Sequence, residues 1–193
     1  MFTKGIPREF LRNLGFIFQS HNLLPWFTIR KNLELPLKIF GLSGEKWEKN
    51  VDRLLEMVEL SDYAEAYPTE LSGGMQQRVG VIRAMVHDPE ILLMDEPFGE
   101  LDAITREQLD LELLSIWEKT QKTIVFITHN VSEAILLSSR VLVMATNPGR
   151  IIQEVKIDLP RPRTLDMMKE EKFLKYEEEI TNLIGELNLE MVE

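Results

Sequence analysis

Residues 71–102 read LSGGMQQRVGVIRAMVHDPEILLMDEPFGELD, and they predict a turn, a helix and a strand in succession. Ser72 is a typical helix N-cap, and Gly73 and Gly74 leave backbone N–H groups uncovered at the helix start. Such a helix start suits a phosphate because of its free N–H groups and the positive end of the helix dipole. Most turns of this kind are only helix starts, so the turn needs support from the rest of the chain.

The strand in this stretch ends in two acids. Residues 91–94, ILLM, form a continuous apolar run, which is typical of a strand buried on both faces of a parallel sheet. Asp95 and Glu96 follow at its carboxyl end, where open α/β sheets bind ligands. Asp95 can hold a magnesium ion there, and Glu96 can orient or deprotonate an attacking water. A helix cap or a surface pair explains the two acids equally well.

Two other apolar runs predict strands with polar residues at their ends. Residues 14–18 lead to Gln19, and residues 123–127 lead to Thr128 and His129. A lone glutamine or histidine at a strand end is more often structural than catalytic. The alternation of these strands with helical patterns at 103–120 and 132–139 predicts an α/β fold with a mostly parallel sheet.

The remaining segments predict helices and a hairpin around this sheet. Residues 28–67 contain helical apolar spacing, with Thr28 as a cap and Pro36 expected to break or kink the first helix near Leu35. Residues 140–145 and 151–159 predict a strand and its hairpin partner, and residues 164–193 predict one or two amphipathic helices. Residues 1–13 are expected to form a loop.

Composition excludes several classes of function. The 193-residue chain has a net charge of -10, which argues against general binding to nucleic acid or anionic lipid. It has no cysteine, hence no disulfide framework or thiolate metal site. No apolar run approaches the ~18 residues that span a bilayer, so a membrane connection is expected to come through a partner.

Five motifs in order carry a family resemblance. They are FIFQ at 16–19, LSGGMQQR at 71–78, ILLMDEP at 91–97, LDA at 101–103 and TH at 128–129. Together they resemble the ATP-binding cassette (ABC) family, and the resemblance covers essentially the whole chain. The run NPGRIIQEVKIDLPRPR is most similar to the ATPase subunits of bacterial nitrate, sulfonate and taurine importers.

The resemblance implies a role for each motif in binding ATP and Mg²⁺. Asp95 and Gln19 become metal-site residues, and Glu96 and His129 become the general base and the γ-phosphate sensor. The signature motif would contact ATP held by a second ATPase subunit, and a further loop would cross the dimer interface. The signature residues are Ser72, Gly73, Gly74 and Gln76, and the interface loop contains Asp102.

The same resemblance implies a division of the chain and a place in the cell. Residues 1–27 and 68–160 correspond to a partial P-loop NTPase core, residues 28–67 to a small inserted helical subdomain, and residues 161–193 to a helical tail. The exposed-looking LLPWF at 23–27 and the helix after Thr28 are expected to dock on a transmembrane permease. The chain would then be peripheral at the cytoplasmic face of the membrane.

Three departures from the family pattern matter. No G-x-x-x-x-G-K-S/T occurs in the sequence, and this loop, with its strand and helix, needs at least ~30 residues where only 13 precede Leu14. The phosphate cradle is therefore expected to be missing rather than altered. Glu100 stands where a small residue is usual, and Asn130 where an acid is common.

These observations leave two main hypotheses. The first is an ATPase subunit of an importer, inactive as an isolated chain because the cradle is absent. The second is a non-hydrolytic module that docks on a permease or on an intact ATPase subunit. A soluble cassette ATPase of translation or DNA repair is a third, disfavoured by the short helical region without a long coiled coil. Loss of an interior cradle strand should also expose the edges and apolar faces of its neighbours.

Overall fold

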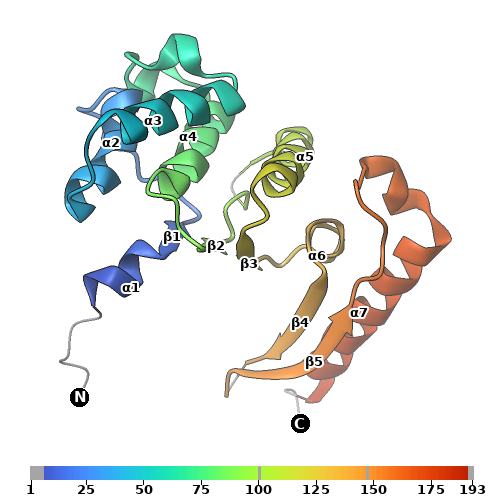
Figure 1. The fold of residues 1–193 in the computed structure, drawn as a ribbon. Coiled ribbons are helices and arrows are strands. Elements are labelled where there is room, and N and C mark those ends of the chain that lie inside the picture. The colour runs from blue at the N-terminus through green and yellow to red at the C-terminus, as the bar shows by residue number, and fades with distance from the viewer. Residues whose placement is uncertain (1–6, 100, 147, 191–193) are drawn as a thin grey trace.

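The computed structural model describes residues 7–99, 101–146 and 148–190, and it has an α/β fold with two separate sheets (Figure 1). One sheet has three parallel strands in the order β1-β2-β3, and the other is an antiparallel pair of β4 and β5. The predicted α/β class with a parallel sheet is confirmed. The strands are β1 (Leu14–Ile17), β2 (Ile91–Asp95), β3 (Thr123–Ile127), β4 (Arg140–Ala145) and β5 (Arg150–Lys156).

The described helices follow in chain order and include three short 3₁₀ turns. The α-helices are α1 (Arg8–Arg12), α2 (Ile29–Phe40), α3 (Glu45–Met57), α4 (Gly73–Met85), α5 (Ala103–Thr120), α6 (Val131–Leu137) and α7 (Glu171–Glu190). The 3₁₀ turns are η1 (Ser61–Tyr63), η2 (Pro68–Glu70) and η3 (Leu165–Lys169). None of these described helices combines the length and hydropathy needed to cross a bilayer.

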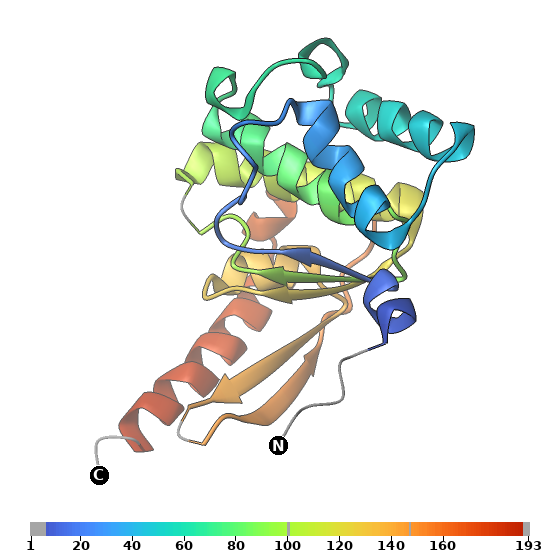
Figure 2. The ribbon, with the colours of Figure 1, turned by 90° about the vertical axis from the view of Figure 1, so that its left-hand side faces the viewer.

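The helices α2, α4 and α5 cover one face of the three-stranded sheet (Figure 2). Ile17, Leu92 and Met94 point into this layer and are buried, because side chains alternate between the two faces of a strand. Gly15 allows the close approach of α4: an added Cβ would lie 2.4 Å from the carbonyl oxygen of Ala84. The main core therefore lies between the sheet and these helices.

The chain after β3 builds a second core around the β4–β5 hairpin. The hairpin is bulged between Val143 and Met144, and it packs with α6 and α7 around Phe173, which is 1% exposed. Buried Arg163 donates to the carbonyl oxygens of Ile135 and Leu136, at the carboxyl end of α6. The predicted hairpin and carboxyl-terminal helix are thus present.

One expectation about the first 40 residues is wrong, and the break that Pro36 was expected to cause does not occur. Residues 8–12 form α1 rather than a loop, and no residue of α1 is buried. Helix α2 continues past Leu35 to Phe40 with Pro36 inside it, and Gly41 ends it in the left-handed conformation at φ 70°. The buried stripe of Ile29, Leu33 and Leu37 explains this, because tertiary packing outweighs the lost backbone hydrogen bond at Pro36.

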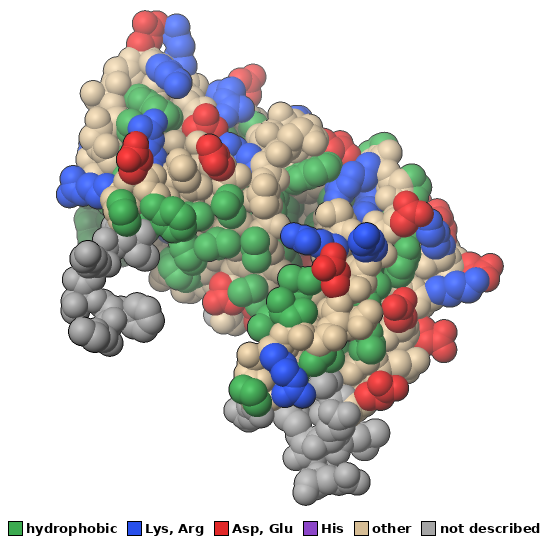
Figure 3. Space-filling model, turned by 60° about the horizontal axis from the view of Figure 1, so that its bottom comes forward, with side chains coloured by type: hydrophobic (Ala, Val, Ile, Leu, Met, Phe, Trp, Pro, Cys, Tyr) green, Lys and Arg blue, Asp and Glu red, His purple; other side chains and the backbone are tan. Residues whose placement is uncertain are grey.

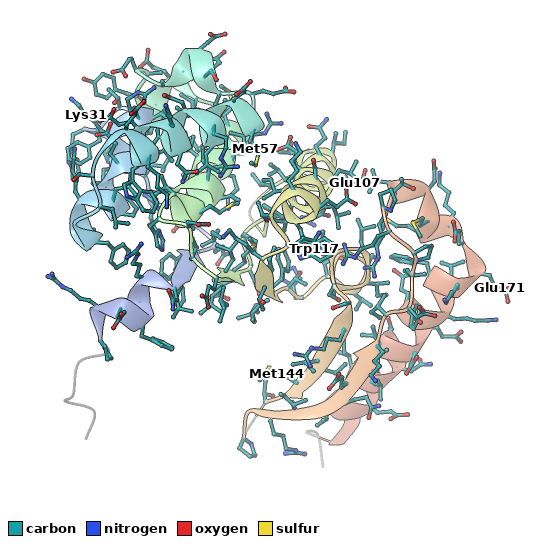
Figure 4. All side chains as sticks on the ribbon, in the orientation of Figure 1. Lys31, Met57, Glu107, Trp117, Met144 and Glu171 are labelled. Atoms are coloured by element: carbon teal, nitrogen blue, oxygen red, sulfur yellow. The ribbon has the colours of Figure 1, made fainter. Side chains whose placement is uncertain are left out.

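The second face of the three-stranded sheet is largely uncovered by the described residues. Phe16, Val125 and Ile127 lie on this face and are 50%, 49% and 54% exposed. Met144 on β4 is 63% exposed and points away from α7 (Figure 4). Seen from below, hydrophobic side chains gather across this region (Figure 3).

The strand edges are open as well. Within the described residues, β3 has β2 as its only sheet neighbour, and β4 pairs only with β5. An open edge beside an uncovered apolar face is a site for pairing or aggregation. Within the described residues, both sheets therefore end in strands with unpaired edges.

Candidate functional site

The four predicted strand-end residues lie at one edge of the parallel sheet. Met94 pairs with Ile17 on one side and with Phe126 on the other, so the three strands end level with one another. Gln19 comes shortly after β1, Asp95 is the last residue of β2, Glu96 follows it, and His129 comes shortly after β3. The parallel register thus brings together residues that are far apart in the sequence.

Glu96 and His129 are in direct contact. The Nδ1 atom of His129 lies 3.3 Å from Oε2 of Glu96, while the two side chains are 70% and 34% exposed. Glu96 has φ 43°, a left-handed conformation that is uncommon for a residue with a Cβ. Its N–H donates to the carbonyl oxygen of Ile127, which fixes this turn to β3. Such strain is often found at functional sites.

Gln19 reaches the same turn through Gly99. A Cβ added to Gly99 would lie 3.6 Å from Nε2 of Gln19 and 3.4 Å from Oε2 of Glu96. The glutamine amide and the glutamate carboxylate therefore converge on one glycine. Asp95 is exposed at the end of β2, immediately before Glu96.

The residues at this edge can supply only part of the ligand shell of a magnesium ion. Asp95 and Gln19 offer a carboxylate and an amide oxygen, and Mg²⁺ commonly takes one or two protein oxygens and completes its shell with water and phosphate oxygens. Among the described residues no group of three or more histidine and acidic side chains could hold a metal on its own. The edge is thus suited to a metal that arrives with a phosphate ligand.

Two side chains that sequence reasoning did not single out hold the turn after Glu96. Gln77 of α4 is 2% exposed and donates its amide to the carbonyl oxygen of Pro97. Arg106 of α5 donates Nε to the carbonyl oxygen of Phe98 at 3.3 Å. The only signal in the sequence was that a polar Gln77 interrupts the apolar face of a helix.

A small pocket of about 10 Å³ opens beside Glu96 and His129. It is large enough for about one water molecule. Its walls combine carboxylates, an imidazole and one guanidinium with apolar surface. The lining residues are Glu96, Gly99, Arg106, Thr128, His129, Asn130 and Glu133.

The predicted signature residues lie at the start of α4 and do not line this pocket. The Oγ atom of Ser72 accepts from the N–H of Met75 at 3.3 Å, which confirms Ser72 as the N-cap. Nothing lies within 4 Å of a Cβ placed on Gly73, so this side of the turn is open. Gln76 donates its amide to the carbonyl oxygen of Leu71 at 3.1 Å, and this bond braces the turn.

The predicted interface residue Asp102 lies next to the signature turn. It caps α5, accepting from the N–H of Thr105 at 3.1 Å and from its hydroxyl at 2.6 Å. These two bonds, the hydroxyl first, lower the pKa of Asp102 below its usual value. A Cβ on Gly74 would lie 3.2 Å from Cγ2 of Thr105, so the two loops touch.

Of the two residues that depart from the family pattern, the structure describes Asn130 but not Glu100. Asn130 is the N-cap of α6, and its Oδ1 atom accepts from the N–H of Glu133 at 3.2 Å. Asparagine caps helices about as well as aspartate, so this departure preserves the local structure. Glu100 lies outside the described residues.

The segment LLPWF is held in place by one buried side chain. Asn32, which is 0% exposed, donates to the carbonyl oxygens of Leu24, Phe27 and Thr28 and accepts from the N–H of Leu24. Trp26 projects from this braced loop and is 67% exposed. A well-fixed loop with an exposed tryptophan is a suitable contact surface.

Comparison with known proteins identifies relatives. A family model described as "ABC transporter" matches residues 2–99. An uncharacterized ABC transporter ATP-binding protein of Methanocaldococcus jannaschii is 46% identical over 170 residues, which are 88% of this chain and 62% of the relative. The nitrate import ATP-binding protein of Synechocystis is 43% identical over 88% of this chain and 66% of its own length.

A third relative is named for the import of a different solute. The taurine import ATP-binding protein of Rhizobium johnstonii is 48% identical over 147 residues, which are 76% of this chain and 56% of the relative. The chain therefore spans less than two thirds of the length of the relatives it matches.

Proposed function

Because this chain belongs to the ABC transporter family, we propose that it serves as the ATP-binding subunit of an importer and couples ATP hydrolysis to solute transport. The observation that carries the proposal is the convergence of Gln19, Asp95, Glu96 and His129 at one edge of the parallel sheet. Phosphate and metal chemistry in open α/β folds takes place at this edge.

The geometry supports distinct roles for these four residues. Asp95 and Gln19 would hold magnesium, which would supply positive charge to offset that of the β and γ phosphates of ATP. Glu96 accepts a proton from the attacking water, and His129, 3.3 Å away, is placed to contact the γ-phosphate. The pocket between them has room for that water.

The signature turn serves a different ATP site, on a second ATPase subunit. Ser72, Gly73 and Gly74 present a capped helix start with open space in front of it, and Gln76 braces the turn. Asp102 and Thr105 lie alongside, at the surface proposed to cross the dimer interface. Backbone N–H groups at a helix start favour an anion such as the γ-phosphate of the opposing subunit.

The phosphate cradle is not part of these 193 residues. Backbone N–H groups and a lysine normally supply most of the counter-charge for the phosphates, so we propose that residues 1–193 alone bind ATP weakly and do not hydrolyse it. In a mixed dimer the chain contributes its signature turn to the other subunit, while its own Glu96 and His129 stay idle. The exposed Trp26 loop contacts a permease at the cytoplasmic face of the membrane.

A non-hydrolytic docking module is the second candidate function. The braced Trp26 loop favours it, since this surface is complete whether or not ATP is hydrolysed. The sequence of the DNA upstream of the first codon separates the two candidates: a continuous frame encoding G-x-x-x-x-G-K-S/T supports the full ATPase.

Rescue of a partner subunit tests the proposal directly. The partner is an intact relative, such as the Synechocystis nitrate import protein, whose own signature serine is replaced by arginine. Adding this chain should restore ATP hydrolysis, and Ser72→Arg should abolish the rescue. Glu96→Gln is the matched control and should rescue as well as the unaltered chain. Equal loss with both variants, or tight ATP binding by the chain alone that Asp95→Asn abolishes, contradicts the proposed division of labour.

A further inference from the structure

The buried amide of Gln77 connects three segments at the edge of the parallel sheet. Gln77 lies near the start of α4 and is 2% exposed. Its Nε2 atom donates to the carbonyl oxygen of Pro97, in the turn that follows Glu96. Its Oε1 atom lies 3.3 Å from Nδ1 of His21, in the loop that follows Gln19. One side chain thus joins α4 to the two loops that carry Gln19 and Glu96.

The chemistry of the partners fixes the direction of both hydrogen bonds. The carbonyl oxygen of Pro97 can only accept, so the NH₂ group of Gln77 faces it and the amide oxygen faces His21. That oxygen also only accepts, so the neutral imidazole of His21 carries its hydrogen on Nδ1. Both polar atoms of the buried amide are therefore satisfied, and replacing either partner leaves a buried polar atom of Gln77 unpaired.

Other contacts hold the backbone of the His21 loop on the same helix. Arg83 of α4 donates to the carbonyl oxygens of His21 and Asn22 at 2.9 and 2.8 Å. A Cβ added to Gly80 would lie 3.7 Å from Cβ of His21, so the loop lies directly on α4. A change that removes only the imidazole of His21 therefore breaks its link to Gln77 and leaves these backbone contacts in place.

The signature turn lies at the start of the helix that Gln77 anchors. The carbonyl oxygen of Ser72 accepts from the N–H of Gln76 at 2.9 Å, so the turn is continuous with α4. Apart from the close approach of Thr105 to Gly74, the glycines of this turn have open space beside them in the described structure. The position of the turn relative to the sheet therefore follows that of α4, and Gln77 is the buried polar contact between this end of α4 and the sheet edge.

We propose that Gln77, held between His21 and Pro97, is a positioning residue that fixes the signature turn relative to the loops of Gln19 and Glu96. The importance of this positioning for ATP hydrolysis rests on the function proposed above, in which the signature turn acts on ATP held by a second subunit. In a mixed dimer the sheet edge then supports the signature turn, although its own acids stay idle. Gln77 positions rather than catalyses, because its amide is buried and both of its polar atoms are bonded within the chain.

Four substitutions separate the hydrogen bonds from the fold. His21→Asn keeps a donor to Gln77, because Nδ2 of asparagine and Nδ1 of histidine are both attached to Cγ, whereas His21→Leu removes the donor. Gln77→Met has a side chain of similar length and removes the link from the other side. Gln108→Met, at an exposed position of α5, is the matched control.

NMR tests the link without ATP. The 193-residue chain is labelled with ¹⁵N at histidine and glycine and ligated to an unlabelled soluble carrier protein. At pH ~8, where histidine is mostly neutral, the ring of His21 should carry its hydrogen on Nδ1, and Gln77→Met should return it to Nε2, which histidine favours in water. A His21 ring with its hydrogen on Nε2 in the unaltered chain overturns the link.

The same spectra report the position of the signature turn. The amide resonances of Gly73 and Gly74 should shift in His21→Leu, although His21 is distant in the sequence, and the shift should exceed that in His21→Asn and in Gln108→Met. Resonances of Gly73 and Gly74 that do not move in His21→Leu overturn the positioning role. This readout also decides the matter if Gln77→Met does not fold.

The rescue experiment described above tests the consequence for hydrolysis. Gln77→Met should lower kcat of the rescued pair by about tenfold or more, and His21→Leu should lower it in the same direction, because a slightly misplaced group loses much of its effect on the transition state. The KM for ATP should change little, since the partner's own cradle binds the nucleotide. His21→Asn and Gln108→Met should rescue as well as the unaltered chain.

The outcomes distinguish this inference from the proposed function. If Gln77 is only structural, Gln77→Met lowers Tm but leaves kcat per folded chain unchanged, and this result overturns the positioning role. If the unaltered chain does not rescue the partner, the proposed function fails instead, and the resonances of His21, Gly73 and Gly74 still support or overturn the positioning of the turn.

Discussion

The uncovered face of the sheet gives a prediction that one pair of matched substitutions can test. Ile17 on β1 and Ile127 on β3 belong to the same three-stranded sheet but point to opposite faces. Ile17 is 3% exposed and packs beneath the helices, whereas Ile127 is 54% exposed. The same substitution, isoleucine to threonine, should therefore have very different effects at the two positions.

The expected magnitudes follow from burial. At position 17 the substitution removes a buried methylene, at about 0.8 kcal/mol, and places a hydroxyl without a partner in the core, at about 1–3 kcal/mol. Ile17→Thr should thus cost about 2–4 kcal/mol. At position 127 half of the side chain is already in solvent and the hydroxyl is hydrated, so Ile127→Thr should cost less than about 1 kcal/mol.

Thermal unfolding and light scattering measure the two consequences. For a chain of this length, each kcal/mol lowers Tm by about 2–4 °C, so Ile17→Thr should lose about 4–16 °C and Ile127→Thr at most about 4 °C. Ile127→Thr should also reduce aggregation, because it makes an exposed apolar face more polar. Equal losses of Tm, together with a monomeric, cooperatively unfolding parent chain, would show that this face is covered in solution and would refute the reasoning.

Two further predictions concern buried polar side chains in the first 90 residues. Asn32→Ala should cost about 2–4 kcal/mol in urea unfolding, because it leaves the backbone of the Trp26 loop without partners, whereas Glu34→Ala on the same helix should be nearly neutral. Burial lowers the pKa of His87, whose Nε2 donates to the carbonyl oxygen of Leu14 at 3.0 Å. The unfolded chain then takes up a proton as pH falls below ~6.5, so stability should decline on acidification through that value, and His87→Gln should flatten the decline measured between pH 7 and pH 5.

The positions of the strands could be predicted from the sequence, but their environment could not. The runs at 14–18, 91–94 and 123–127 are continuously apolar, and a continuous run indicates burial on both faces. In the structure only one face is covered, so Phe16 and Val125 are half exposed. The apolar pattern indicates that side chains on both faces favour burial. It does not indicate whether the residues that bury the second face lie within residues 1–193.

Long-range contacts explain most of what the sequence did not reveal at the candidate site. The strand-end residues could be named because the parallel register follows from the fold class. Gln77 and Arg106 were not identified as supports of the Glu96 turn, because each contacts it only after α4 and α5 have packed on the sheet. Pro36 is the opposite case. The proline favours a break in the helix, but the packing of α2 keeps the helix continuous.

In the function proposed above, the stretch 71–102 contributes to two ATP sites, and its two ends are joined through α4. Its signature turn touches Thr105 through Gly74, and its acid turn is bonded to α4 through Gln77. The far end of α4 is fixed to the loop after Gln19, because Arg83 donates to the carbonyl oxygens of His21 and Asn22 at 2.9 and 2.8 Å. A shift of α4 relative to the Glu96 turn would disturb the buried Gln77 contact at one place and the more exposed Arg83 contacts at the other.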